Sequence, residues 1–301
     1  ISNKLVLVDG LRYSHIALSA NFIDNSFFEL PATQFSDNFG ALTGSVGLVY
    51  KPQRNTKLYT TVASGFRAPN IDDATKVFDP TDDIVMVPNL NIKPEYAYNA
   101  EIGWQQKMPL GFRFSADAYY TYLNNLIRRT PFSLGGQDSL VFDGEWMQIN
   151  ANVNAGEGYI AGSAFALSFE KNGFTFEKKI NYTYGYDTTN ESPLGHIPPL
   201  FGQASVAYTA LADKLDVGLL CRYNAAKKME NYDFSTDKGS EATPEGTPAW
   251  YVINARAAYQ IHSNMQISVG LNNLLDYHYK PFASGISGAG RSAVVSLRSS
   301  F

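Results

Sequence analysis

Apolar and polar residues alternate along most of this chain, which is the period of a β-strand with one apolar and one polar face. Within 112–122 the even-numbered positions are Phe, Phe, Ala, Ala, Tyr and Tyr, and four of the five odd-numbered ones are Arg, Ser, Asp and Thr. Segments 215–223 and 266–272 alternate in the same way. A sustained helical pattern at i, i+3, i+4 and i+7 is hard to find, so the sequence predicts an all-β, antiparallel fold.

We expect about twelve strands, most of them longer than the roughly 5–6 residues usual in soluble proteins. They lie near 5–14, 42–51, 57–66, 95–107, 112–127, 147–170, 173–187, 198–211, 214–225, 250–262, 265–279 and 290–301. Such lengths suit the roughly 9–11 residues that a tilted strand needs to cross a bilayer.

The predicted connections alternate between short and long. Short ones fall near 52–56, 108–111, 171–172, 211–213 and 262–264, and long ones near 15–41, 67–94, 128–146, 188–197, 226–249 and 280–289. Short periplasmic turns with long extracellular loops are typical of bacterial outer-membrane barrels. The pattern therefore favours a transmembrane barrel over a soluble sandwich and places both termini on the periplasmic side.

Composition agrees with this class and excludes others. Aromatic residues make up 14% of the 301 residues and charged residues only 17%, below the roughly 25% of soluble domains. No run approaches the roughly 18 apolar residues of a membrane-spanning helix. The net charge of −4 and the lack of a Lys/Arg cluster indicate no nucleic-acid partner. Cys221 is the single cysteine, so no internal disulfide forms.

Several segments resemble, in order, the sequence boxes of TonB-dependent receptors. Residues 65–70 (GFRAPN) resemble the FRAP box, and 87–95 (VPNLNIKPE) resemble the NPNL box with Val87 in place of its first Asn. Residues 193–199 (PLGHIPP) and 272–279 (NNLLDYHY) resemble two later elements, and the last strand alternates up to a terminal Phe301. The motif residues are Phe66, Arg67, Ala68, Pro69, Pro88, Asn89, Leu90, Pro94, Glu95, Asn273, Leu274 and Phe301.

This resemblance implies a receptor in the bacterial outer membrane whose 22-stranded barrel is closed by a plug domain. Residues 1–301 are then a single partial domain, the C-terminal portion of the barrel, and the plug and about ten strands precede Ile1. The expected partners are outer-membrane lipid, TonB through the missing plug segment, a small-molecule or glycan ligand, and the barrel-assembly machinery through the C-terminal strand. The implied function is active import of a scarce solute such as a siderophore, cobalamin or an oligosaccharide, with no cofactor and no enzymatic activity.

Candidate ligand contacts lie on the loop that follows the FRAP box. Arg67 is a charge at a strand tip, but we expect it to pair with lumenal or plug carboxylates. The acidic residues of the loop are Asp72, Asp73, Asp79, Asp82 and Asp83. Their spacing does not match an EF-hand, so a solvated loop face is favoured over a metal site.

Histidines point to no metal or catalytic site. His15, His196, His262 and His278 are expected in separate turns and loops, and no pair has a metal-ligand spacing. The resemblance also bears on haem, because haem receptors of this family typically carry a His between the FRAP and NPNL boxes. None is present here, which disfavours haem as the ligand.

Two other hypotheses stay open at this point. One is a complete twelve-stranded barrel that acts as a passive pore, or as a rim hydrolase that uses His15 or His196. The other is a soluble β-sandwich binding module, which would remain soluble without detergent.

Overall fold

Twelve long antiparallel strands, joined edge to edge in chain order, form a continuous wall in the computed structural model. The structure describes residues 4–21, 23, 34–75, 77–81, 83–234, 236–237 and 239–300. The wall strands are β1 (Leu5–Asn21), β2 (Gln34–Tyr50), β3 (Thr56–Arg67), β6 (Glu95–Lys107), β7 (Phe112–Pro131), β9 (Glu145–Lys171), β10 (Phe174–Asp187), β12 (Phe201–Ala210), β13 (Leu215–Asn224), β16 (Trp250–His262), β17 (Met265–Asn272) and β18 (Ser292–Ser299).

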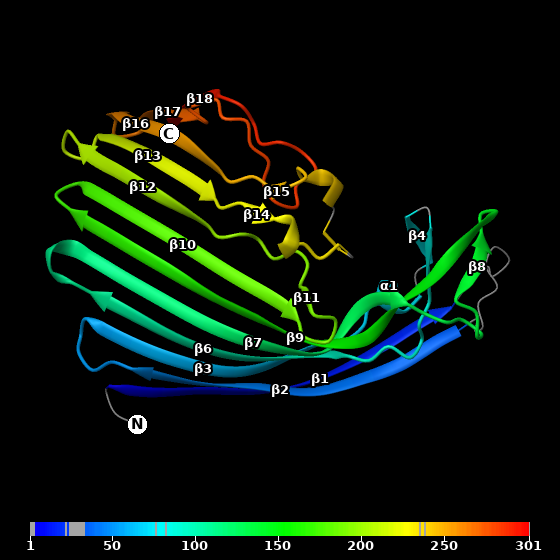
Figure 1. The fold of residues 1–301 in the computed structure, drawn as a ribbon. Coiled ribbons are helices and arrows are strands. Elements are labelled where there is room, and N and C mark those ends of the chain that lie inside the picture. Colours follow the sequence, from blue (N-terminus) through cyan, green and yellow to red (C-terminus); the bar gives the residue numbers. More distant parts are fainter. Residues whose placement is uncertain are drawn as a thin grey trace.

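The wall curves into an open trough with β1 at one edge and β18 at the other (Figure 1). Within the described part of the chain, β1 pairs only with β2 and β18 only with β17, so the twelve strands do not close on themselves. An unclosed antiparallel wall confirms the prediction of a partial barrel. It contradicts both the self-contained twelve-stranded barrel and the sandwich, in which two sheets would pack face to face.

The two faces of the wall differ in chemistry, as the alternation predicts. On one face large apolar side chains are exposed from strand to strand, as a lipid-facing surface requires. They include Leu42, Val46, Val62, Ile102, Tyr120, Leu219, Val269 and Val295. On the other face polar groups bond across strands. The Tyr119 and Thr183 hydroxyls lie 3.0 Å apart, Asn99 donates to Thr121 over 2.9 Å, and the Tyr59 hydroxyl donates to Asp117.

Short turns lie at one end of the trough and long loops at the other, and both chain ends lie toward the short turns (Figure 1). The link between β9 and β10 is Asn172-Gly173, and both residues have positive φ, as a two-residue hairpin turn requires. In the described part of the chain no helix is long and apolar enough to cross a membrane. The α-helix described, α1 (Ile71–Thr75), is a single short turn in a loop.

The loop end carries further short elements. They are β4 (Phe78–Thr81), β5 (Ile84–Val87), β8 (Ser139–Phe142), β11 (Ser192–Pro193), β14 (Lys227–Lys228), β15 (Gly246–Thr247), and the 3-10 turns η2 (Met229–Asn231) and η3 (Gly239–Glu241); a third such turn, η1 (Pro109–Gly111), lies at the opposite end. We call β4, β5, β8 and residues 145–151 of β9 the rim sheet. β5 joins β9 in parallel, and Val85, Val87, Met147, Ile149 and Ala151 form a buried core there.

Several predicted boundaries and residue positions are wrong. The long connection expected at 15–41 is mostly strand, because β1 runs to Asn21 and β2 starts at Gln34, with Asn21 paired to Gln34. The strand expected at 265–279 ends at Asn272, because Asn273 and Asp276 adopt left-handed backbone. His15 and His262 belong to strands β1 and β16 rather than to turns or loops.

Candidate functional site

Arg67, at the end of β3, joins two carboxylates across the base of the loop that follows. Its guanidinium donates to Asp73 over 2.6 Å and also to Glu95, the first residue of β6. The other oxygen of Glu95 accepts the Ile127 backbone N–H over 2.6 Å. Arg67 therefore ties together both ends of this loop and the neighbouring β7.

Asn70 and Asp73 explain why a helical turn starts directly after the FRAP box. The Asn70 side chain accepts the Asp73 N–H over 2.7 Å, and the Asp73 carboxylate accepts the Asn70 N–H over 3.0 Å. This reciprocal pair is a capping box, which satisfies N–H groups that a helix leaves free at its start. The Asp73 carboxylate therefore has a structural role, because it accepts hydrogen bonds from both the Asn70 N–H and the Arg67 guanidinium.

The other predicted acidic contacts do not gather into one site. Asp72 is exposed on α1, Asp79 lies in β4, Asp83 is exposed beside β5, and Asp82 lies outside the described residues. Across the described part of the chain, no group of three or more His, Cys, Asp or Glu side chains could hold a metal ion.

Two motif asparagines anchor loops. Asn89 is buried, donates to the Asn152 carbonyl over 2.8 Å and accepts the Asn91 N–H. Asn273 is only 3% exposed; its amide donates to the carbonyls of Tyr277 and Ala289 and accepts the Tyr277 N–H.

The remaining motif residues lie at strand ends or next to them. Phe66 lies in β3 with Ala68 and Pro69 after it, Pro88 and Leu90 follow β5, Pro94 precedes β6, Leu274 follows Asn273, and Phe301 lies outside the described residues.

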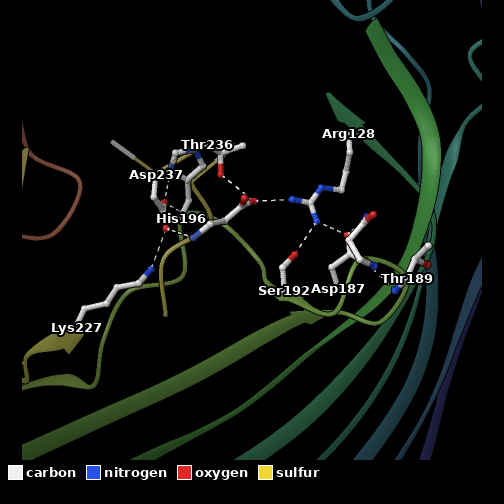
Figure 2. Close-up of polar contacts among 10 residues, drawn as sticks. Arg128, Asp187, Thr189, Ser192, His196, Lys227, Thr236 and Asp237 are labelled. Carbon is white, nitrogen blue, oxygen red and sulfur yellow. Dashed lines mark hydrogen bonds and ion pairs between the residues drawn. The ribbon is translucent and has the colours of Figure 1, made fainter. Parts of the chain in front are cut away.

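A second charged cluster, which we call the latch, lies among the loops that follow β10 and β13 (Figure 2). Arg128 of β7 is its centre. One guanidinium nitrogen donates to Asp187, at the end of β10, and lies 3.4 Å from the Ser192 hydroxyl. Another donates to Asp233 over 3.0 Å. Arg128 therefore holds the 188–200 and 225–249 loops against the wall.

Asp237 continues the latch. Its carboxylate accepts the His196 backbone N–H over 2.8 Å, the Asp233 N–H over 3.2 Å and the Lys227 ammonium over 3.2 Å. The Lys227 nitrogen also donates to the Ile197 carbonyl and lies 3.8 Å from the centre of the Phe282 ring, a cation–π contact. Phe282 brings the 273–291 loop into the same assembly.

Burial and hydrogen bonding shift the pKa values of these charged groups in opposite directions. Burial raises the pKa of Asp187, but hydrogen bonds from Asn190 and Arg128 outweigh it, so its pKa lies below the usual value. For Lys227 burial dominates over the attraction of Asp237 and Asp233, and its pKa is lowered. Asp187 is the last residue of β10, at the loop end of the wall.

A hollow of about 390 Å³ lies between the 225–249 and 273–291 loops, directly beside the latch. Its lining combines the rings of Tyr232 and Phe282 with the side chains of His196, Asp237 and Glu241. Aromatic walls with a few polar groups are typical of small-molecule sites.

Sequence reasoning placed the candidate contacts on the loop after β3 and missed this hollow. The available signal was a run of mixed charge, in which Lys227, Lys228 and Lys238 lie among the acids Glu230, Asp233, Asp237, Glu241 and Glu245. Such a run usually indicates a solvated loop, and nothing local to it reveals that Arg128 lies opposite.

Comparison with known proteins gives one family. Residues 1–274 match the model of the TonB dependent receptor-like β-barrel. A probable hemoglobin and hemoglobin-haptoglobin-binding protein of Haemophilus influenzae is 25% identical over 261 residues, covering 81% of this chain and 25% of that protein. The probable TonB-dependent siderophore receptor PiuA of Acinetobacter baumannii is 23% identical over 306 residues, covering 99% of this chain and 38% of that protein.

Among solved structures, the copper transporter OprC superposes with a TM-score of 0.77 at 17% identity, covering 100% of this chain and 46% of that one. At this identity the likeness concerns the fold alone. The chain spans less than half the length of each of these relatives.

Proposed function

The chain belongs to the TonB-dependent receptor β-barrel family, and on this premise we propose that it forms part of the wall and ligand-binding loops of an outer-membrane importer. The solute is an iron-carrying molecule of the siderophore type, and TonB delivers the energy. Relatives of the chain are transport receptors and not enzymes, which supports import over catalysis.

The hollow beside the latch is the observation that carries this proposal. It lies at the loop end of the wall, which in this family is the extracellular end. Its loops are fixed to β7 and β10 by buried charges, so the lining is held in place before a ligand arrives. Preorganised loops at the mouth of a barrel are well suited to capture a dilute solute.

A siderophore-type solute is favoured over haem for a reason in the sequence. No histidine lies between Arg67 and Glu95, where haem receptors of the family typically carry one. PiuA, a relative aligned over 99% of the chain, is named as a siderophore receptor.

A growth experiment tests the proposal. A strain that lacks the gene is complemented and grown under iron limitation on a panel of ferric siderophores, with and without functional TonB. We expect growth on at least one member, dependent on both the gene and TonB. Growth that persists without TonB would point instead to a passive pore.

One side chain of the hollow can be changed while its backbone contact with the latch is kept. His196 contributes its backbone N–H to Asp237, and its imidazole, 70% exposed, lies 3.6 Å from the same carboxylate. His196→Asn should therefore raise the concentration needed for half-maximal uptake. His15→Asn, on β1 and outside the hollow, is the matched control and should not.

A further inference from the structure

An exposed apolar pair lies at the tip of the rim sheet. Val141 of β8 and Trp146 of β9 face each other directly across the hairpin. Their side chains remain 54% and 75% exposed. A tryptophan at this exposure leaves a large apolar ring in water, and rings of this kind often carry much of the energy of protein–protein contacts.

The tip is rigid rather than loose. Leu140, Phe142 and Met147, which alternate with the exposed pair, pack into the buried core of the rim sheet against Val85 and Val87. The hairpin turns at Asp143-Gly144, both with positive φ. These are the residue types and conformations of a tight two-residue turn. The apolar pair is thus presented in one fixed geometry.

The surroundings of the pair carry one sign of charge. Asp143 and Glu145 lie at the turn, and the backbone carbonyls of Asp83 and Asp138 accept the N–H groups of Gln148 and Ile149, both over 2.8 Å. Acidic residues therefore flank both edges of β9 near the tip, and the nearest basic residue paired with β9, Arg129, lies opposite Asn152. Segments 77–92 and 132–151 contain no Lys, Arg or His.

The tip also projects away from the wall. Figure 1 shows β8 and the start of β9 extending past the ends of β1 and β2, at the end opposite the short turns. An acidic tip at this position is repelled by an anionic membrane surface, which argues against insertion into lipid. It attracts a basic surface instead.

We infer that the Val141–Trp146 pair and its acidic surround form a docking surface for an extracellular protein whose basic surface encloses an apolar hollow. The inference rests on the proposed function only in placing the loop end outside the cell. The Trp146 ring fills the partner's hollow, and Asp83, Asp138, Asp143 and Glu145 steer the approach.

Binding to a basic protein of known chemistry tests this surface. The whole receptor is held in nanodiscs, and association with cytochrome c and with its succinylated, acidic form is measured at low and at about 0.15 M ionic strength. We expect the basic form alone to bind, more weakly as salt increases.

Trp146→Ala should weaken this binding by about tenfold or more, and Glu145→Lys should weaken it and reduce its salt dependence. Trp104→Ala is the matched control, because this exposed tryptophan lies on the lipid-facing side of β6 and should not affect binding. Both Trp146 and Glu145 are exposed, so the variants are expected to fold.

Absence of cytochrome c binding, or binding indifferent to Trp146 and Glu145, overturns the inference. So does Trp146-dependent attachment to phosphatidylglycerol vesicles, which would make the tip a membrane contact. Cytochrome c binding is measured independently of import. His196→Asn should impair uptake of a small solute and leave cytochrome c binding unchanged. Trp146→Ala should weaken cytochrome c binding and leave uptake of a small solute unchanged.

Discussion

Arg128 and Asp187 form an ion pair between two strands that are not neighbours, because β9 lies between β7 and β10 in the wall. The Asp187 side chain is fully buried and the Arg128 side chain is 13% exposed. The pair therefore crosses over β9 at the loop end and brings the 188–200 loop with it. Buried charges thus hold the 188–200 and 225–249 loops, whereas the Asn273 amide anchors the 273–291 loop.

Replacing Arg128 with Gln should release two loops. The change leaves Asp187 and Asp233 without their main cation, and breaking a buried pair from one side costs about 3–5 kcal/mol. Hydrogen exchange should accelerate in 188–200 and 225–249. Arg113→Gln is the control, because its ion pair with Glu170 is more than 60% exposed on both sides and is worth about 0–1 kcal/mol. Equal effects of the two variants would contradict the role given to Arg128.

Acid should loosen the turn after β10. The pKa of Asp187 is lowered in the folded protein, so its contribution to stability is complete above the unfolded value of 3.8 and is lost as pH falls through the folded value. A spin label at Glu191→Cys, in a Cys221→Ser background, should stay immobile at pH 5 and become mobile only below about pH 4. With Asp187→Asn the label should be mobile at both pH values. If the acid-induced change in mobility remains in this variant, a group other than Asp187 causes it.

Asn273→Ala should detach the 273–291 loop at its start. The buried amide makes three hydrogen bonds, and unsatisfied buried partners cost about 1–3 kcal/mol. Limited proteolysis should cut this loop faster. Asn272→Ala removes one bond, a 3.3 Å contact with Ser292, from an exposed neighbour and serves as the control. Similar cleavage of both variants would show that the amide bonds of Asn273 are not the anchor.

A lysine on the lipid face should destabilise the wall, and one on the opposite face should not. Val269 is 37% exposed on the apolar face of β17, whereas Ser268 points to the polar face. Val269→Lys should cost about 2–4 kcal/mol in urea unfolding of the receptor in vesicles, depending on depth. Ser268→Lys should change stability by far less. If the two variants unfold alike, the assignment of the faces is wrong.

Most of the wall could be predicted from the sequence. Alternation with period 2 is a local property, because each side chain points away from its neighbours along the same strand. This alternation therefore predicted the twelve strands, their two faces and the end of the wall that carries the short turns. It failed at 34–41, where Asp37, Asn38 and Gly40 interrupt the apolar pattern, and at 15–21, the segment that pairs with it. The pairing of these two segments depends on the partner strand rather than on local preference.

The site was decided by tertiary structure alone. Arg128 lies 59 residues from Asp187 and 105 from Asp233, so no pattern within a strand or loop connects them. The parallel pairing of β5 with β9, which gives the rim sheet its core, likewise joins segments more than 60 residues apart. The sequence by itself determined the wall, because strand periodicity is local; the latch and the hollow depend on long-range contacts, which only the folded wall brings together.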